Sequence, residues 1–110
     1  FSTEMRSGKI IKIDDGFTKL LGYTEDDVKN GLVFKQFVPD LEYSEIIAEL
    51  REQFIEKKYA CYRHEVVSKT GEIRMIVAFF TIQNKLLNGH RVLEVSVADI
   101  TDYTHFPETK

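Results

Sequence analysis

The sequence predicts an α+β domain, a five-stranded antiparallel sheet with helices gathered on one face. Two short segments typical of strands come first, and helical periods occupy the middle of the chain. From Tyr59 the hydrophobic period is two, and turn signals divide this region into three strands. Such strands form an antiparallel meander, which the two early strands complete as members of the same sheet.

Composition narrows the function classes. The 110 residues fit one domain, with 43% hydrophobic and 30% charged residues. A net charge of −3 argues against a nucleic-acid partner, because such proteins carry a basic surface. No apolar run approaches the roughly 20 residues of a membrane helix, and a single cysteine suits a reducing compartment. We therefore expect a cytoplasmic domain without direct membrane contact, although a parent chain could be membrane-anchored.

The first strands and the first helix are short. Ser7 and Gly8 give a turn signal, and the β-branched segment 9–13 follows it as the second strand. Within segment 17–21 the apolar residues recur at i, i+3 and i+4, which predicts one face of a short helix. Gly22 is expected to end that helix, because glycine adopts the left-handed conformation readily.

Two more helices are expected before the meander. Thr24 can cap the first of them, with Asp27 three residues later as a near capping box. The longest helix follows, and either Asp40 or Ser44 can cap it. Its apolar residues within 46–54 form one continuous stripe, which is expected to face the core.

The three strands of the meander are expected at 59–68, 72–85 and 91–100. The segments 69–72 and 88–89 between them are hairpin signals. The middle strand is apolar on both faces, whereas a sheet with one wet face would alternate. We therefore expect its outer face to be covered, either by a second copy of the chain or by a flanking helix. The candidate interface residues are Met75, Val77 and Phe79.

The inward faces of the strands, with two phenylalanines between the helices, outline a possible pocket. It would suit a small, largely apolar or aromatic ligand, unless the side chains simply fill the space. His64 either hydrogen-bonds a ligand and senses pH, or is a core histidine satisfied by a neighbouring backbone or carboxylate group. The pocket candidates are Phe34, Phe37, Ile47, Tyr62, His64, Ile76, Phe80, Val95 and Val97.

The sequence contains few residue patterns typical of a catalytic or metal-binding site. Asp99 continues the apolar row of the last strand, where desolvation would raise the pKa of a carboxylate. One alternative is thus a small isomerase-like enzyme with Asp99 as general base; the other is a structural or signalling role. Cys61 and His64 lie three apart in a strand, so they point to opposite faces and cannot share a metal ion. No catalytic residue is assigned.

Three motifs, in order along the chain, resemble the PAS domain family. The segment 10–28 resembles the opening of a PAS domain, and 69–74 resembles the turn before its fourth strand. The sequence Asp-Ile-Thr-Asp at 99–102 is similar to the family's ending. The resemblance covers residues 1–102 and implies strand order 2-1-5-4-3 with helices enclosing a pocket. It also implies an outer sheet face that dimerises or packs a helix.

The resemblance implies a non-enzymatic sensor or interaction module, typical of bacterial two-component signalling. Asp99 and Thr101 would be the exit of the signal, and 103–110 the start of a linker to a C-terminal effector of kinase or cyclase type. Because the sequence begins at Phe1 without an initiator methionine, we expect a domain cut from a longer chain. The Asn-Cys motif of the flavin-binding LOV branch and the histidine of the haem-binding branch are both missing from the helical segments. We therefore expect no cofactor.

Overall fold

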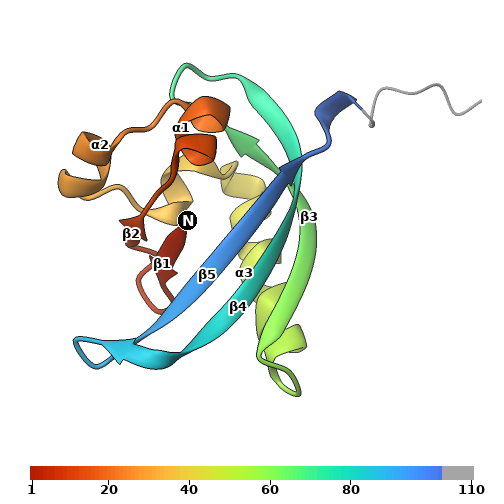
Figure 1. Ribbon diagram of the computed structural model, residues 1–110. Coiled ribbons are helices and arrows are strands. Elements are labelled where there is room, and N and C mark those ends of the chain that lie inside the picture. Colours follow the sequence, from red (N-terminus) through yellow and green to blue (C-terminus); the bar gives the residue numbers. More distant parts are fainter. Residues whose placement is uncertain (103–110) are drawn as a thin grey trace, which may run out of the picture.

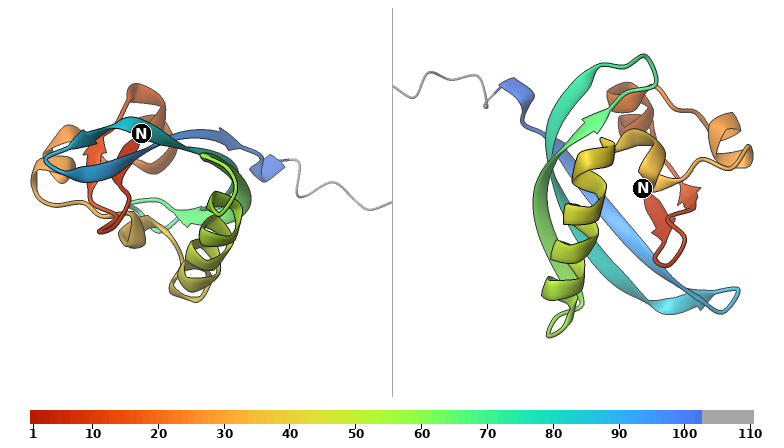
Figure 2. Two further views of the ribbon diagram at one scale, coloured as in Figure 1. Left: turned by 90° about the horizontal axis from the view of Figure 1, so that it is seen from below. Right: turned by 180° about the vertical axis from the view of Figure 1, so that it is seen from behind.

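The computed structural model describes residues 1–102 and confirms the predicted α+β architecture. Five antiparallel strands form one twisted sheet in the order β2-β1-β5-β4-β3, and the helices lie on one side of it (Figures 1 and 2). The expected linker at 103–110 lies outside the described residues. The elements are β1 (Ser2–Glu4), β2 (Ile10–Lys12), α1 (Asp15–Leu21), α2 (Glu25–Lys29), the 3-10 helix η1 (Phe34–Phe37), α3 (Asp40–Phe54), β3 (Tyr59–Val67), β4 (Ile73–Leu87) and β5 (His90–Asp99).

The meander has the predicted strands to within about two residues at each end. The turn between β4 and β5 consists of Asn88 and Gly89, both with positive φ, 51° and 81°. This geometry fits a two-residue hairpin, whose twist matches that of its strands. The pairing of β3 with β4 is continuous from Tyr59 opposite Thr81 to Val67 opposite Ile73, so it fixes which side chains share a face.

Local caps hold the two short helices; the end at Gly22 and the capping box of Thr24 and Asp27 were predicted, whereas the cap at Asp14 was not. The carboxylate of Asp14 accepts from the backbone N–H of Phe17 at 2.8 Å and caps α1, which ends at Gly22 with φ 84°. Asp27 accepts from the backbone N–H of Thr24 at 2.8 Å and closes the capping box of α2. The apolar face of α1 packs in the core, where Phe17 and Leu21 are buried.

The expected caps of α3 are wrong. Pro39 stands at the N-cap, and its carbonyl accepts from the backbone N–H groups of Glu42 and Tyr43. Asp40 is the first helical residue and Ser44 lies one turn further in, so neither provides a side-chain cap. Proline suits this position because it has no N–H to leave unpaired and its φ is already fixed near the helical value.

The helix α3 packs beside β3, an edge strand of the sheet (Figure 2). Ile46 and Leu50 of its apolar stripe are buried in the core. The side-chain amide of Gln53 donates to the carbonyl of Cys61 and accepts from the N–H of Cys61, both at 2.8 Å. Gln53 thus satisfies one residue of an edge that could otherwise pair with another chain.

Candidate ligand-binding cavity

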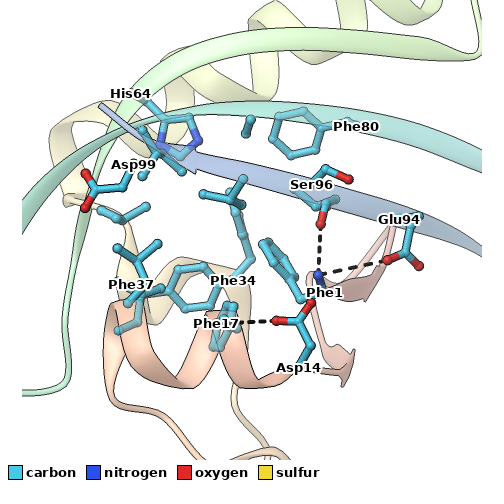
Figure 3. A pocket seen from close by; sticks show the side chains of 18 residues that line it. Phe1, Asp14, Phe17, Phe34, Phe37, His64, Phe80, Glu94, Ser96 and Asp99 are labelled. Carbon is cyan, nitrogen blue, oxygen red and sulfur yellow. Dashed lines mark hydrogen bonds and ion pairs between the residues drawn. The ribbon is translucent and has the colours of Figure 1, made fainter. Parts of the chain in front are cut away.

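A cavity of about 400 Å³ lies between α1, η1 and the inner face of β3, β4 and β5 (Figure 3). Its volume falls in the range of sites for small molecules. Of the nine predicted pocket residues, Ile47 lines a second cavity instead, and Tyr62 packs behind the ring of His64 with ring centroids 6.0 Å apart. The other seven line the first cavity: Phe34, Phe37, His64, Ile76, Phe80, Val95 and Val97.

Other lining residues were not foreseen. The helix α1 contributes Phe17, Leu20 and Leu21, the apolar face that the sequence had predicted without saying what it covers. The helical period could have predicted that these residues line the cavity, because a helix seven residues long buries its one apolar face against the rest of the domain. The remaining unforeseen residues are Phe1, Asp14, Gly16, Val66, Ala78, Glu94 and Ser96. Asp99 also lines the cavity, where the pocket-enzyme alternative had placed it.

Aromatic rings make up much of the wall. Phe34 lies at the centre of this cluster, edge-on to the rings of Phe37, His64 and Phe80 at centroid distances of 5.3, 6.2 and 6.5 Å. Edge-to-face pairs at these distances are favourable beyond the area they bury. The rings thus form a rigid, largely apolar surface.

His64 is the buried titratable residue of the cavity, 2% exposed. Its Nδ1 lies 2.9 Å from the backbone carbonyl oxygen of Glu65. Its Nε2 is buried and has no hydrogen-bond partner among residues 1–102. Burial lowers the pKa of His64, and the Glu65 carbonyl and the charge of Glu42 oppose this only in part. The predicted role of a core histidine satisfied by a neighbouring backbone group therefore fits Nδ1 but not Nε2.

Asp99 is held as an anion at the end of β5. One carboxylate oxygen accepts from the hydroxyl and the backbone N–H of Thr101, at 2.6 and 3.0 Å. The other accepts from the guanidinium of Arg74. Partial burial raises the pKa of Asp99, but the hydrogen bonds from Thr101 and Arg74 more than offset this and lower it overall. The expectation of a raised pKa, on which the general-base alternative depended, is wrong.

The Arg74 partner of Asp99 was not foreseen. Arg74 shares the inner face of β4 with Ile76, which pairs with Asp99 across the ladder. Arg74 and Asp99 therefore lie at the ends of the inward-facing apolar rows of two adjacent strands. The alternation of side chains along each strand, which can be read from the sequence, was the signal that could have predicted their pairing. The hydroxyl of Thr101 also accepts from the backbone N–H of Met75 at 2.9 Å, which attaches the segment after β5 to the start of β4.

A second cavity of about 630 Å³ lies between the β1–β2 turn and α3. Its wall includes Met5, Ile47, Leu50 and Phe54. Ile47, which was predicted to line the pocket, therefore lines this second cavity and not the first.

The predicted interface residues lie on the outer face of β4. Phe79 is 52% exposed, while Met75 and Val77 are partly exposed. Ile73 continues the same row with 56% of its surface exposed. Across the described part of the chain, no three His, Cys, Asp or Glu side chains come together as metal ligands. No helix in residues 1–102 is long and apolar enough to cross a membrane.

The structure resembles several solved PAS domains. No protein-family model matches the sequence, and no curated protein matches it significantly. A PAS domain from Colwellia psychrerythraea superposes with a TM-score of 0.76 at 17% identity, covering 92% of this chain and 84% of the other. A PAS domain from a two-component sensor histidine kinase gives 0.72 at 13%, covering 90% and 81%. The PAS-B domain of Drosophila melanogaster Cycle, solved with bound ethylene glycol, gives 0.68 at 11%, covering 88% and 96%.

Proposed function

We propose that this chain, which has the PAS fold, is a non-enzymatic sensory module of a cytoplasmic signalling protein. It binds a small apolar or aromatic molecule in the 400 Å³ cavity and relays the change to an effector on its C-terminal side. One observation carries the proposal: β5 both lines the cavity, through Val95 and Val97, and leads directly into the segment Asp99 to Thr101. The likeness to a PAS domain of a sensor histidine kinase supports a kinase as effector.

The relay depends on how β5 is paired. The strand β1 pairs with β5 only from Val92 to Glu94, with further backbone bonds between Phe1 and Val95. The strand β4 pairs with β5 along the stretch that follows, with Ala78 opposite Val97 and Ile76 opposite Asp99. A ligand beside Val97 would therefore contact β5 two residues before Asp99, so that a displacement of Val97 can reach the segment 99–101 along the backbone of one strand.

A second copy of the chain is the partner that we propose for the outer face. The apolar ridge of β4 lies beside small residues of β5, with Phe79 opposite Ser96 and Val77 opposite Ala98. In a two-fold dimer, the ridge of each copy can lie over the strip of small residues of the other. The exposed rings and methyl groups would then be buried at a self-complementary interface.

The ligand can be detected in the protein as purified from cells. Native mass spectrometry of the 110-residue chain should show a non-covalent adduct that is lost on denaturation. The control is Ala78→Leu, since Ala78 is 1% exposed and lines the cavity, so that a larger side chain there occupies ligand space. An adduct that persists in this variant would place the ligand elsewhere. Two negative results together would contradict the proposal. The chain from cells would carry no adduct, and a library of small apolar compounds would leave the NMR signals of the backbone amides that line the cavity unchanged.

The relay has its own measurement. Ligand binding should move the amide signals of Ile100 and Thr101, which lie beyond the cavity, together with those of Val97. Shifts confined to the cavity wall would mean that binding occurs without transmission. An isomerase activity lost in Asp99→Asn at unchanged stability would favour the pocket-enzyme alternative.

A further inference from the structure

One residue of the cavity wall has a buried polar atom that the fold leaves unsatisfied. His64 is 2% exposed and lines the cavity, and its Nε2 finds no hydrogen-bond partner in the part of the chain that the structure describes. Buried polar atoms are rarely left in this state, because each one has lost its hydrogen bond to water without replacement. A ligand that supplies the missing bond would remove this penalty.

The hydrogen bond at the other nitrogen determines what Nε2 can do. Nδ1 lies 2.9 Å from the carbonyl oxygen of Glu65, which can only accept, so Nδ1 carries the proton. In a neutral imidazole, Nε2 is then a bare acceptor. It can be satisfied only by a group that donates, such as a hydroxyl or an N–H.

The charges around the cavity select against ions. No lysine or arginine side chain of residues 1–102 lines the cavity. Phe1 does line it, but its amino group already donates to the carbonyl of Val95 at 2.8 Å and pairs with Glu94 at 4.0 Å, so an anion would find no free counter-charge. The three carboxylates of the wall are already engaged: Asp14 caps α1, Asp99 binds Arg74, and Glu94 accepts from the hydroxyl of Ser2 at 2.6 Å. In Figure 3, Asp14 and Glu94 lie across the aromatic cluster from Asp99. Around His64 the wall is aromatic, with Phe34 edge-on to its ring.

We infer that the cavity selects a small, neutral, mainly aromatic molecule with one O–H or N–H group, which donates to Nε2 of His64. This inference rests on the proposed function, because it specifies the ligand class of the same cavity. Carboxylates of the same shape are excluded, and hydrocarbons of the same shape bind more weakly. His64 is thus the residue that determines specificity.

Three naphthalene probes test the inference on the 110-residue chain: 2-naphthol, 2-methylnaphthalene and 2-naphthoate. They share one ring system and differ in offering a donor, a methyl group or a negative charge. We expect naphthol to bind about tenfold more tightly than methylnaphthalene, and naphthoate not to bind. In ¹⁵N spectra of the histidine rings, naphthol alone should shift the Nε2 resonance of His64, a readout that needs no variant.

Two variants complete the test. His64→Phe keeps a ring in place without the acceptor, so it should bind naphthol and methylnaphthalene equally. Tyr62→Phe is the matched control, because Tyr62 packs on His64 but does not line the cavity, and it should retain the preference.

Equal binding of naphthol and methylnaphthalene to the natural chain would overturn the role of His64 and leave the proposed sensor intact. If no probe shifts the Nε2 resonance of His64, then Nε2 is unpaired or bound only to water. This result would also overturn the role of His64 in selecting the ligand. Failure of all three probes would overturn the ligand class, whereas the proposed function fails only if the chain from cells carries no adduct and the library finds none.

Discussion

The two faces of the sheet carry similar side chains in opposite surroundings. Phe79 and Phe80 are neighbours on β4, yet Phe79 is 52% exposed on the outer face and Phe80 is 1% exposed on the inner face. The inner face is covered by this chain's own helices and keeps a cavity, whereas the outer face presents its apolar row to solvent. The difference teaches that an apolar row on a strand predicts burial, but the covering element can be part of the same chain or another molecule.

The largest effect is expected from Phe80→Ala. Phe80 lines the cavity and contacts Phe34 edge-on, so truncation removes buried area and enlarges an existing void. We expect a loss of about 3–5 kcal/mol in the free energy of unfolding, measured by urea denaturation. The matched control is Phe79→Ala, which should cost under about 1 kcal/mol in the monomer. Equal losses would remove the contrast between the faces.

Asp99→Asn tests the end of the inner face. Replacing the carboxylate weakens its bonds to Arg74 and Thr101, and we expect a loss of about 1–2 kcal/mol at pH 7. Because the pKa of Asp99 is lowered by folding, its contribution is present above the unfolded pKa of about 4 and is lost as the pH falls through the folded value. The two proteins should therefore converge in stability toward pH 2. A difference that persists there would show that charge is not the cause.

His64 makes the inner face sensitive to mild acid. Its folded pKa is lowered, so below the unfolded value of about 6.5 the unfolded chain binds a proton that the folded chain resists. Stability should fall between pH 7.5 and 5.5, by no more than about 1.4 kcal/mol, as followed by thermal unfolding.

His64→Phe is the control for this acid sensitivity and should remove it. Glu65, whose pKa is raised by its hydrogen bond with Glu42, acts in the opposite direction and remains in both proteins. A variant as acid-sensitive as the natural chain would assign the effect to other groups.

The smallest effect on folding is expected on the outer face. Phe79→Ser should change the stability of the monomer by less than about 0.5 kcal/mol. It should nevertheless abolish self-association, which sedimentation velocity would detect as a dimer that becomes a monomer. Thr81→Ser, further along the same face, is the control and should remain dimeric. A natural chain that is monomeric at high micromolar concentration would contradict the proposed interface.

Much of the fold was predictable because its signals are local. The hairpin at Asn88 and Gly89, the cap at Thr24 and the end of α1 at Gly22 each depend on residues close in sequence. The predicted start of α3 was wrong, since Pro39 rather than Asp40 or Ser44 takes the N-cap position. The alternation of β3 correctly placed His64 on the inner face.

The site was predictable only in part. Parity identified most of the cavity wall on the sheet, but could not say which helix covers it or that Ile47 faces a second cavity. Desolvation raises the pKa of Asp99, but hydrogen bonds from Thr101 and Arg74 outweigh it and reverse the expected direction. The contribution of Arg74 was not readable locally, because Arg74 reaches Asp99 from the adjacent strand.

By itself, the sequence determined the elements and the faces of the strands, because periodicity and turn residues act over a few positions. The order of the strands in the sheet was predicted only from the resemblance to PAS domains. The tertiary structure decided the rest: the empty volume between α1 and the sheet, the unsatisfied Nε2 of His64 and the exposure of Phe79. These features arise from how distant segments pack. A buried acceptor is unsatisfied only when every neighbour has been placed and none of them donates.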